Sequence, residues 1–546
     1  MTWNLLLISS VILLCILLHR ISEKIGVPML LAFIVLGMAF GTDGILKIPF
    51  DNYPLAENIC SIALIFIMFY GGFGTNWNEA RPVAVKSVLL STLGVVITAA
   101  LTGFFCYFVL KFSFLDSMLM GSVISSTDAA SVFSILRSKN MGLKYGTASM
   151  LELESGSNDP CSYMLTAVVL SAMSGTASTG SVLSMIFAQL FFGILFGCLI
   201  AFAARFILRH MQFHIAGFDM AFVIAVALLS YTLPSMAGGN GYLSAYMVGI
   251  ILGNTKIRNK KSLVNFFDGI TGLMQMLIFF LLGLLATPSK LPSIFLPALA
   301  IALFLTLVAR PLAVASILTP FKCRFNQQVL ISFAGLRGAA SIVFAIMATV
   351  DAAYTSFDVY HIVFCIVLLS ILFQGSFLSQ AAKKLNMSDT NADVMKTFSD
   401  YSEEVDLQFI RIRITEEHTW SHTAVKDISL PPDTLFLMLL RGEETMVPSG
   451  ETVFLPGDTA VLSARGYQEQ ENLELTEMKI TAKSPWIGIK ISDFSPYPGE
   501  LVIMILRGEE TIVPKGDTVI MENDLLVIYS IPEYRKNLPV KGLPSE

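Results

Sequence analysis

Residues 152–163 read ELESGSNDPCSY, a polar and charged stretch between two apolar runs that are long enough to enter a lipid bilayer. It brings Glu152, Glu154, Asn158 and Asp159 into one helix-length segment. An ionised side chain at the centre of a bilayer costs roughly 3 kcal/mol or more, and those that occur there usually serve an ion or proton pathway. The stretch therefore predicts a membrane helix with such a role, provided that its surroundings also lie in the membrane.

The composition of the whole chain is that of an integral membrane protein. Its 546 residues are 54% hydrophobic and 14% charged, with a mean hydropathy of +0.69, whereas soluble domains carry about 25% charged residues. Residues 1–384 hold 22 Lys and Arg and 14 Asp and Glu, but residues 385–546 hold 14 and 27. We therefore expect a membrane domain over 1–384 followed by an acidic tail. The net charge of −5 gives no reason to expect a nucleic-acid partner.

Hydropathy predicts thirteen transmembrane helices in residues 1–384. The loops on one side of the membrane hold 17 Lys and Arg, and those on the other side hold three. Basic residues favour the cytoplasmic side, so we expect the N-terminus outside and the tail in the cytoplasm. No basic residue precedes the first apolar run, which argues against a cleaved signal peptide. The predicted spans are residues 4–19, 27–41, 58–75, 88–110, 115–136, 147–172, 181–204, 217–234, 239–253, 264–286, 292–319, 327–350 and 360–382.

The polar residues well inside these spans have the chemistry of a cation site. The stretch SSTDAAS (125–131) places Thr127 and Asp128 among small residues that do not favour a regular helix, and Pro160 removes a backbone hydrogen-bond donor. Irregular backbone at membrane depth is tolerated where it lines a cavity or is buried in protein. Carboxylate, amide, hydroxyl and carbonyl oxygens are the ligands that hard cations prefer. The sequence thus predicts a site for an alkali cation. A buried acid–base pair that only supports the structure is the alternative for the charged groups.

A single carboxylate in such a site can hold a proton or a cation, but hardly both at once. Mutual exclusion on Asp159, combined with two conformations that open to opposite sides, is the minimal mechanism of cation/proton exchange. The sequence therefore favours a secondary transporter.

Three motifs resemble one family of transporters. ESGSNDP (154–160), the pair Thr127-Asp128 and GLRGAAS (335–341) together resemble the NhaP-type branch of the monovalent cation/proton antiporters, in particular its bacterial potassium/proton, cell-volume-regulation subgroup. The resemblance covers the thirteen predicted spans. It implies inverted repeats, and fifth and twelfth helices that cross where both are unwound. It also implies a multi-pass protein of the inner (plasma) membrane.

The resemblance assigns roles to individual residues. Asp159 would be the exchanging carboxylate, assisted by Asn158, Thr127, Asp128 and Ser155. Glu154 would form a core ion pair with Arg310. Arg337 would brace the twelfth helix, so that both arginines are structural or tune the charge of the site. One departure is Tyr70 in IMFYGGFGTN (67–76), where many relatives carry an acid.

We expect K⁺ or Na⁺ and H⁺ as substrates, the lipid bilayer as environment, and a homodimer. We expect no enzymatic activity, no cofactor and no metal other than the transported alkali cation. The sequence leaves K⁺ against Na⁺ open, although the type of tail favours K⁺. Since Asn158 carries no charge, Asp159 is the single titrating group of that pair, which favours electroneutral exchange.

The tail contains an internal duplication. LFLMLLRGEETMVPSGETVFLPGDTAVLSA (435–464) and LVIMILRGEETIVPKGDTVIMENDLLVIYS (501–530) align without gaps at an offset of 66 residues. Alternating apolar and polar residues, separated by Gly and Pro, predict strands and hairpins. The repeated unit resembles the C-terminal subdomain of potassium-conductance regulators, the TrkA-C type. Such α+β modules pair, and they often bind a small, nucleotide-like regulatory ligand. A plain assembly module without a ligand is the alternative. We expect a linker over 385–405 and units over 406–468 and 469–546.

Other classes of protein fit the sequence less well. A potassium channel gated by the tail would need a filter such as TVGYG, which the chain lacks. A potassium efflux system of the regulator type would need a nucleotide-binding half with GxGxxG, which is also missing. An intramembrane enzyme is disfavoured because the six histidines fall at the ends of predicted spans or in the tail.

Overall fold

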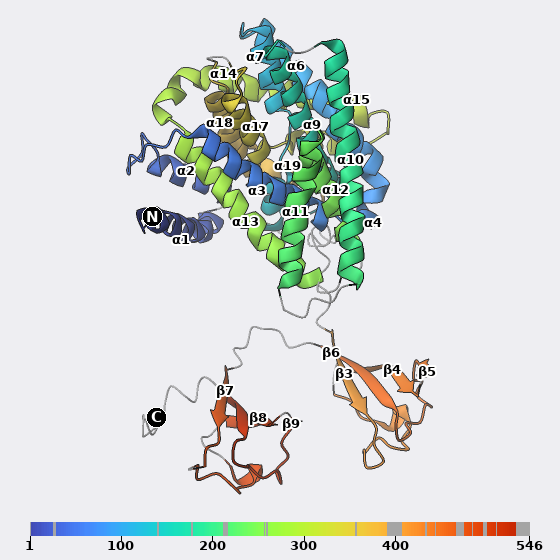
Figure 1. The fold of residues 1–546 in the computed structure, drawn as a ribbon. Helices are drawn as coiled ribbons and strands as arrows, with labels where there is room; N and C mark the ends of the chain where they lie inside the picture. The colour runs from blue at the N-terminus through green and yellow to red at the C-terminus, as the bar shows by residue number, and fades with distance from the viewer. Residues whose placement is uncertain are drawn as a thin grey trace. The chain divides into compact units, whose positions relative to one another are not determined.

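The computed structural model describes residues 2–25, 29–138, 141–175, 178–210, 217–255, 257, 260–354, 357–389, 407–431, 434–442, 444–465, 474–482, 484–494, 500–508 and 510–530. The chain divides into two compact units, Met1–Glu403 and Glu404–Glu546. Figure 1 shows the first unit as a helical body and the second as strands.

The described part of the first unit is built almost entirely of helices. Seven helical runs are long and apolar enough to cross a membrane: Tyr53–Gly74, Trp77–Phe108, Gly180–His210, Phe218–Met236, Lys260–Leu285, Pro288–Leu318 and Val359–Lys384. Three of these runs combine several labelled elements. The α-helices are α1 (Thr2–Ile25), α2 (Met29–Phe40), α3 (Tyr53–Gly74), α4 (Trp77–Ala80), α5 (Ala84–Leu89), α6 (Val95–Phe108), α7 (Phe114–Val123), α8 (Ala129–Ser138), α9 (Thr147–Met173), α10 (Thr179–His210), α11 (Phe218–Met236), α12 (Gly241–Gly253), α13 (Lys260–Leu285), α14 (Leu291–Phe304), α15 (Arg310–Leu318), α16 (Phe325–Phe333), α17 (Ala339–Val350), α18 (Val359–Leu369) and α19 (Ser376–Lys384).

Two helical runs are interrupted by non-helical backbone, and the two interruptions lie against each other. Residues 125–128 separate α7 from α8, and residues 335–338 separate α16 from α17. The backbone N–H of Asp128 donates to the carbonyl of Leu336 at 2.8 Å. Gly338 makes this approach possible, because a Cβ there would lie 2.1 Å from Asp128 Oδ2. The small residues of SSTDAAS therefore do break the helix, as the sequence predicts.

Three further runs contain a π-helical segment, which widens the helix by one residue in a turn. These segments are η2 (Leu90–Gly94), η4 (Leu305–Ala309) and η5 (Ser370–Gly375). η4 ends immediately before Arg310, and η5 begins at Ser370. Short 3-10 turns, η1 (Arg81–Val83) and η3 (Pro288–Lys290), join other helices.

Glycines bring several helices together at backbone distance, and two pairs illustrate this. A Cβ at Gly37 of α2 would lie 2.1 Å from the carbonyl oxygen of Phe280 in α13, and a Cβ at Gly249 of α12 would lie 2.1 Å from that of Phe69 in α3. The largest buried cluster surrounds the first contact and joins α2, α3 and α13 to α17 and α18, and a second cluster that includes Phe69 and Val248 surrounds the other.

The segment that follows the last helix belongs to the helical unit. We call residues 385–389 the exit segment. Its strand β2 (Ser388–Asp389) pairs antiparallel with β1 (Gly142–Leu143), which lies between α8 and α9. The backbone N–H of Lys144 donates to the carbonyl of Met387 at 3.0 Å, and the Met387 side chain is buried. The polar composition of residues 385–405 predicts a linker. The described part of that linker, residues 385–389, is paired with β1, and residues 390–405 lie outside the described residues.

The tail unit contains two four-stranded antiparallel sheets with the same strand order. The first sheet has the order β3-β6-β4-β5 and the second β7-β10-β8-β9. In the described tail the helical content is two 3-10 turns, η7 (Val425–Asp427) and η8 (Ile491–Asp493), so the expected α+β module is there a sheet with one short turn. The strands are β3 (Leu407–Arg413), β4 (Leu435–Arg441), β5 (Glu444–Met446), β6 (Thr459–Arg465), β7 (Glu474–Lys479), β8 (Glu500–Arg507), β9 (Glu510–Ile512) and β10 (Leu525–Ser530).

The Arg of each LRGEET motif forms the same contacts in both sheets. Arg441 donates to Asp458 Oδ1 at 2.9 Å and to Asp458 Oδ2 at 2.7 Å. Arg507 donates to both oxygens of Asp524 at 2.8 Å. Each aspartate also accepts a backbone N–H three residues before it. The shared residues of the duplication therefore stabilise the strand ends.

Candidate functional site

The residues predicted to bind the ion come together where α9 passes the break between α7 and α8. Asn158 Nδ2 of α9 donates to Thr127 Oγ1 at 2.5 Å, and Ser155 Oγ donates to the Thr127 carbonyl at 2.8 Å. Both bonds compensate backbone or side-chain groups that the break leaves without helical partners. They fix the position of α9 against the non-helical residues 125–128.

Asp159 lies beside this contact, and its side chain is buried. The residue is 5% exposed, and its Oδ1 has no hydrogen-bond partner within the described part of the chain. Asn158 Oδ1 is likewise without a partner among those residues. Because buried polar atoms are normally satisfied, these two oxygens on consecutive residues are candidates to bind a proton, water or cation.

Asp128 is engaged differently. Its Oδ2 accepts a hydrogen bond from Ser131 Oγ at 2.5 Å, and its Oδ1 accepts one from the Ser131 N–H at 3.2 Å. This is the arrangement of an N-cap, here at the start of α8. The carboxylate of Asp128 therefore stabilises the helix end beside the site.

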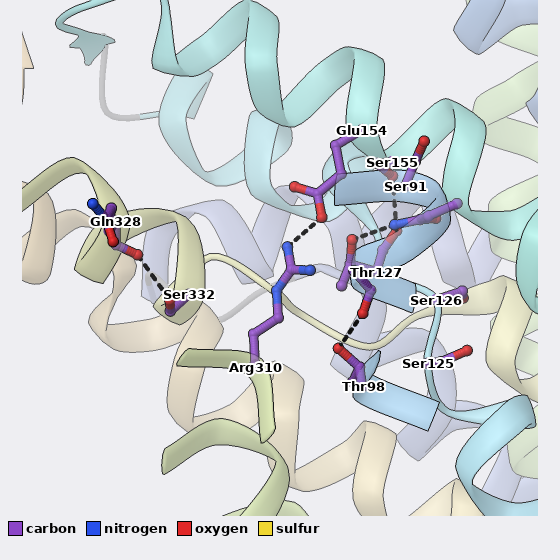
Figure 2. Close-up of polar contacts among 12 residues, drawn as sticks. Ser91, Thr98, Ser125, Ser126, Thr127, Glu154, Ser155, Arg310, Gln328 and Ser332 are labelled. Atoms are coloured by element: carbon purple, nitrogen blue, oxygen red, sulfur yellow. Dashed lines mark hydrogen bonds and ion pairs between the residues drawn. The ribbon is translucent and has the colours of Figure 1, made fainter. Parts of the chain in front are cut away.

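Glu154 and Arg310 form the ion pair that the resemblance implies. Arg310 Nη2 lies 2.5 Å from Glu154 Oε1, and both side chains are at most 2% exposed. Figure 2 shows the guanidinium of Arg310 directed at the Glu154 carboxylate across the space between their helices. Arg310 reaches this position from the end of the π-helical segment η4.

Arg337 connects the two breaks. Its Nη1 donates to the carbonyls of Ser125 and Ser126, at 2.8 and 2.5 Å, and its backbone N–H donates to Ser370 Oγ at 3.0 Å. Non-helical residues at membrane depth leave carbonyls that need donors, and Arg337 supplies two of them. Arg337 thus holds residues 335–338 against residues 125–128, and its role as a brace for the twelfth predicted span stays a prediction.

Sequence reasoning missed two polar groups in the helical unit. Tyr70 OH donates to Asp268 Oδ1 at 3.0 Å, so a carboxylate of α13 stands at the position where Tyr70 replaces an acid. Asp268 lies in the apolar run Lys260–Leu285, and charge inside that run was the signal that could have revealed it. The second group is the buried hydroxyl of Tyr246, which looked like one more aromatic core residue.

Comparison with families of known proteins agrees with these motifs. Residues 9–384 match the family described as sodium/hydrogen exchanger, transmembrane, and residues 475–535 match the TrkA-C domain. The chain is 32% identical over 463 residues to the K(+)/H(+) antiporter NhaP of Alkalimonas amylolytica, a match that covers 84% of this chain and 80% of the relative. It is 32% identical over 526 residues to the K(+)/H(+) antiporter NhaP2 of Shewanella oneidensis, covering 93% and 90%.

The fold also resembles a solved structure. The sodium proton antiporter MjNhaP1 from Methanocaldococcus jannaschii, determined at pH 8, superimposes with a TM-score of 0.61 at 25% sequence identity. The superposition covers 70% of this chain and 99% of that one. The helical unit therefore has the fold of a membrane antiporter, and the sheets of the tail are additional to it.

Proposed function

The chain belongs to the sodium/hydrogen exchanger family, and we propose that Asp159 is the carboxylate at which it exchanges a monovalent cation for a proton. As a member of that family it is a multi-pass membrane protein and a cation/proton antiporter, a transporter rather than an enzyme. The observation that carries the proposal is the buried Asp159 carboxylate whose Oδ1 has no partner among the described residues.

The surroundings of Asp159 suit mutual exclusion of proton and cation. Asn158 is fixed by its bond to Thr127, so its amide oxygen can face a cation without moving. Ser155 and the backbone of residues 125–128 add further oxygens, which are hard ligands. A proton on Asp159 removes the charge that the cation needs, and a bound cation disfavours the proton.

K⁺ is the favoured cation, with Na⁺ as the open alternative. Two relatives are named K(+)/H(+) antiporters, and their matches cover 84% and 93% of this chain, so each extends beyond what the helical unit alone could supply. The solved relative is named a sodium proton antiporter and matches the helical unit. A tail of TrkA-C type, which resembles potassium-conductance regulators, supports K⁺.

The proposed architecture is a membrane domain that crosses the inner membrane thirteen times over residues 1–384, with the N-terminus outside. Two copies of the chain would form a homodimer. Each predicted span has a described helical run within its range. The two interrupted runs, α7–α8 and α16–α17, have the same helix–break–helix order and touch at their breaks, which supports inverted repeats and crossed fifth and twelfth helices.

The tail is proposed to regulate exchange through two units, 406–468 and 469–546. The common strand order of the two sheets supports the duplication. We expect the exit segment to transmit changes in the tail to the proposed ion site, because β2 pairs with β1, the strand directly before α9. A small, nucleotide-like ligand bound between units is one form of this regulation, and assembly without a ligand is the other.

The decisive experiment is proton movement in everted membrane vesicles, titrated separately with K⁺, Na⁺ and Li⁺. Asp159→Asn should insert normally and abolish cation-dependent proton movement, because the amide cannot exchange a proton. Asp43→Asn is the matched control, since Asp43 lies outside the helices and accepts a hydrogen bond from Ser289 N–H. Near-normal exchange by Asp159→Asn would refute the proposal, and cation flux without proton movement would favour a channel.

A further inference from the structure

The hydroxyl of Tyr246 is buried in the helical unit, with other hydroxyls near it but none placed for a well-formed hydrogen bond among the described residues. Tyr246 lies on α12 and is 2% exposed, and its hydroxyl has no partner in the part of the chain that the structure describes. Tyrosine hydroxyls in protein interiors usually find a partner. Tyr360 shows the ordinary arrangement, since its buried hydroxyl donates to the carbonyl of Leu282 at 2.7 Å.

Gly156 places this hydroxyl on the helix that carries the ion site. A Cβ at Gly156 would lie 2.2 Å from Tyr246 Cε2 and 2.7 Å from the Tyr246 hydroxyl oxygen. Only glycine leaves room for the ring at this point. Position 156 is three residues before Asp159 on α9, and residues three apart share a helix face. The hydroxyl therefore lies one turn to the N-terminal side of Asp159.

Other oxygens surround the Tyr246 hydroxyl. The side chains of Ser157 and Thr75 lie beside it, and the carboxylate of Glu152 is close enough to act on it electrostatically. Thr75 and Glu152 are buried. The Thr75 hydroxyl donates its hydrogen to the Gly71 carbonyl, and the Ser157 hydroxyl donates to the Leu153 carbonyl, both at 2.8 Å. With these hydrogens committed, the oxygens of Thr75 and Ser157 remain available as acceptors or ligands.

We propose that the hydroxyls of Tyr246, Thr75 and Ser157, with the carboxylate of Glu152, form a second cation site next to that of Asp159. Hydroxyl and carboxylate oxygens are suitable ligands for K⁺ and Na⁺. The ion would exchange part of its water shell for these oxygens before it moves one turn along α9 to Asp159. In the proposed orientation this second site lies on the cytoplasmic side. The inference rests on the proposed function, because it requires a cation that travels along α9.

The test compares Tyr246→Phe with Tyr360→Phe in everted and in right-side-out vesicles. Loss of one oxygen ligand should raise the half-saturating K⁺ concentration of Tyr246→Phe about three- to tenfold at the cytoplasmic face. It should leave the half-saturating concentration at the other face unchanged. Its melting temperature should fall less than that of Tyr360→Phe, because the removed hydroxyl makes no well-formed hydrogen bond with the described part of the chain. Tyr360→Phe should show the reverse: a lower melting temperature with unchanged half-saturation.

A change in the half-saturating K⁺ concentration at one membrane face alone distinguishes an ion ligand from a residue that only supports the structure. The proposal is overturned if half-saturation of Tyr246→Phe is unchanged at the cytoplasmic face, or if it rises equally at both faces. Gly156→Ala provides a second variant, since its Cβ would displace the ring and should shift half-saturation in the same direction.

A binding measurement makes the two sites distinguishable. Purified Asp159→Asn should keep part of the K⁺-dependent rise in melting temperature, because K⁺ still occupies the second site. Adding Tyr246→Phe to Asp159→Asn should remove that remainder. If Asp159→Asn loses the whole K⁺ effect and all exchange, the proposed function stands and the second site does not. If Asp159→Asn retains exchange, the proposed function fails first.

Discussion

Arg310 and Glu154 face each other inside the helical unit, 2.5 Å apart, with side chains at most 2% exposed. The two residues are 156 positions apart in the sequence, so their pairing joins α9 to α15. A buried ion pair contributes little net stability compared with apolar residues, but removal of one partner leaves an uncompensated charge.

Arg310→Ala and Glu154→Gln should each destabilise the purified protein by about 3–5 kcal/mol, and the double variant Glu154→Leu/Arg310→Met should recover much of that loss. Thermal melting in detergent measures the effect. The exposed pair Lys426–Glu451 is the control, because its side chains are 53% and 80% exposed and Lys426→Ala should change little. Unchanged melting of Arg310→Ala would contradict a stabilising role for the pair.

Exchange should be electroneutral, with one cation moved for one proton. Asp159 is the only titrating group of the Asn158-Asp159 pair, and Asp128 is occupied with Ser131 at the start of α8. In proteoliposomes with Na⁺ as the exchanged ion, the rate should not change when valinomycin and a K⁺ gradient impose a membrane potential. A rate that rises with the potential would bring Asp128 into the proton count.

Truncation should separate the exit segment from the rest of the tail. A chain that ends after Asp389 retains β2 and should still exchange ions, with an altered rate or pH threshold. A chain that ends after Lys384 loses β2 and the buried Met387, and should melt at a lower temperature and exchange more slowly. Vesicle assays on equal amounts of inserted protein provide the comparison. Complete inactivity after truncation at Asp389 would mean that the sheets are required for transport itself.

The tail sheets should lose stability in acid. Hydrogen bonds from Arg441 hold the pKa of Asp458 below the ordinary value of about 4, although burial acts against them. The deprotonated carboxylate makes these bonds, so its contribution is complete above that ordinary value and disappears as the pH falls through the lowered pKa. Fluorescence of Trp420, which packs against Phe436, can follow the first sheet once the other three tryptophans are replaced by Phe.

Asp458→Asn tests the same contact at neutral pH. It should destabilise the first sheet by about 1–3 kcal/mol, at the lower end because Arg441 is partly exposed, and should abolish the acid-dependent part of the transition. A matched chain that keeps Trp486 as its only tryptophan follows the second sheet as a control, because Arg507 and Asp524 retain the same bonds there. An acid transition that persists unchanged in Asp458→Asn would contradict the assignment.

The cluster that we propose as the ion site could be anticipated because its residues are close in sequence or carry short motifs. Asn158, Asp159 and Pro160 are contiguous, and the weakness of SSTDAAS as a helix follows from its small residues. Glu154–Arg310 required the family resemblance, since nothing local indicates which of several buried charges will meet. Tyr246 could not be singled out, because a tyrosine in an apolar helix has the same pattern whether or not its hydroxyl is bonded.

The exit segment and two of the tail strands were missed for a different reason. β3 and β7 pair with β6 and β10, but they lie before the two aligned repeats and their sequences differ. β3 does alternate apolar and basic residues from Ile410 to Ile414, whereas β7 lacks such a pattern and is a strand through its pairing with β10. The same holds for Ser388 and Asp389, which are polar and become a strand only through Gly142 and Leu143.

The contact between Gly37 and Phe280 also limits how the helical unit can move. The two backbones are in direct contact at Gly37. A change of side-chain rotamer therefore cannot alter the spacing of α2 and α13 at this point. The same is true of α3 and α12 at Gly249. Because α3 also packs on α13, we expect the four helices α2, α3, α12 and α13 to move as one rigid body. Movement of helices past one another during the transport cycle would then occur at interfaces packed with long side chains. A methyl group added at Gly37 or Gly249 would push the paired helices apart.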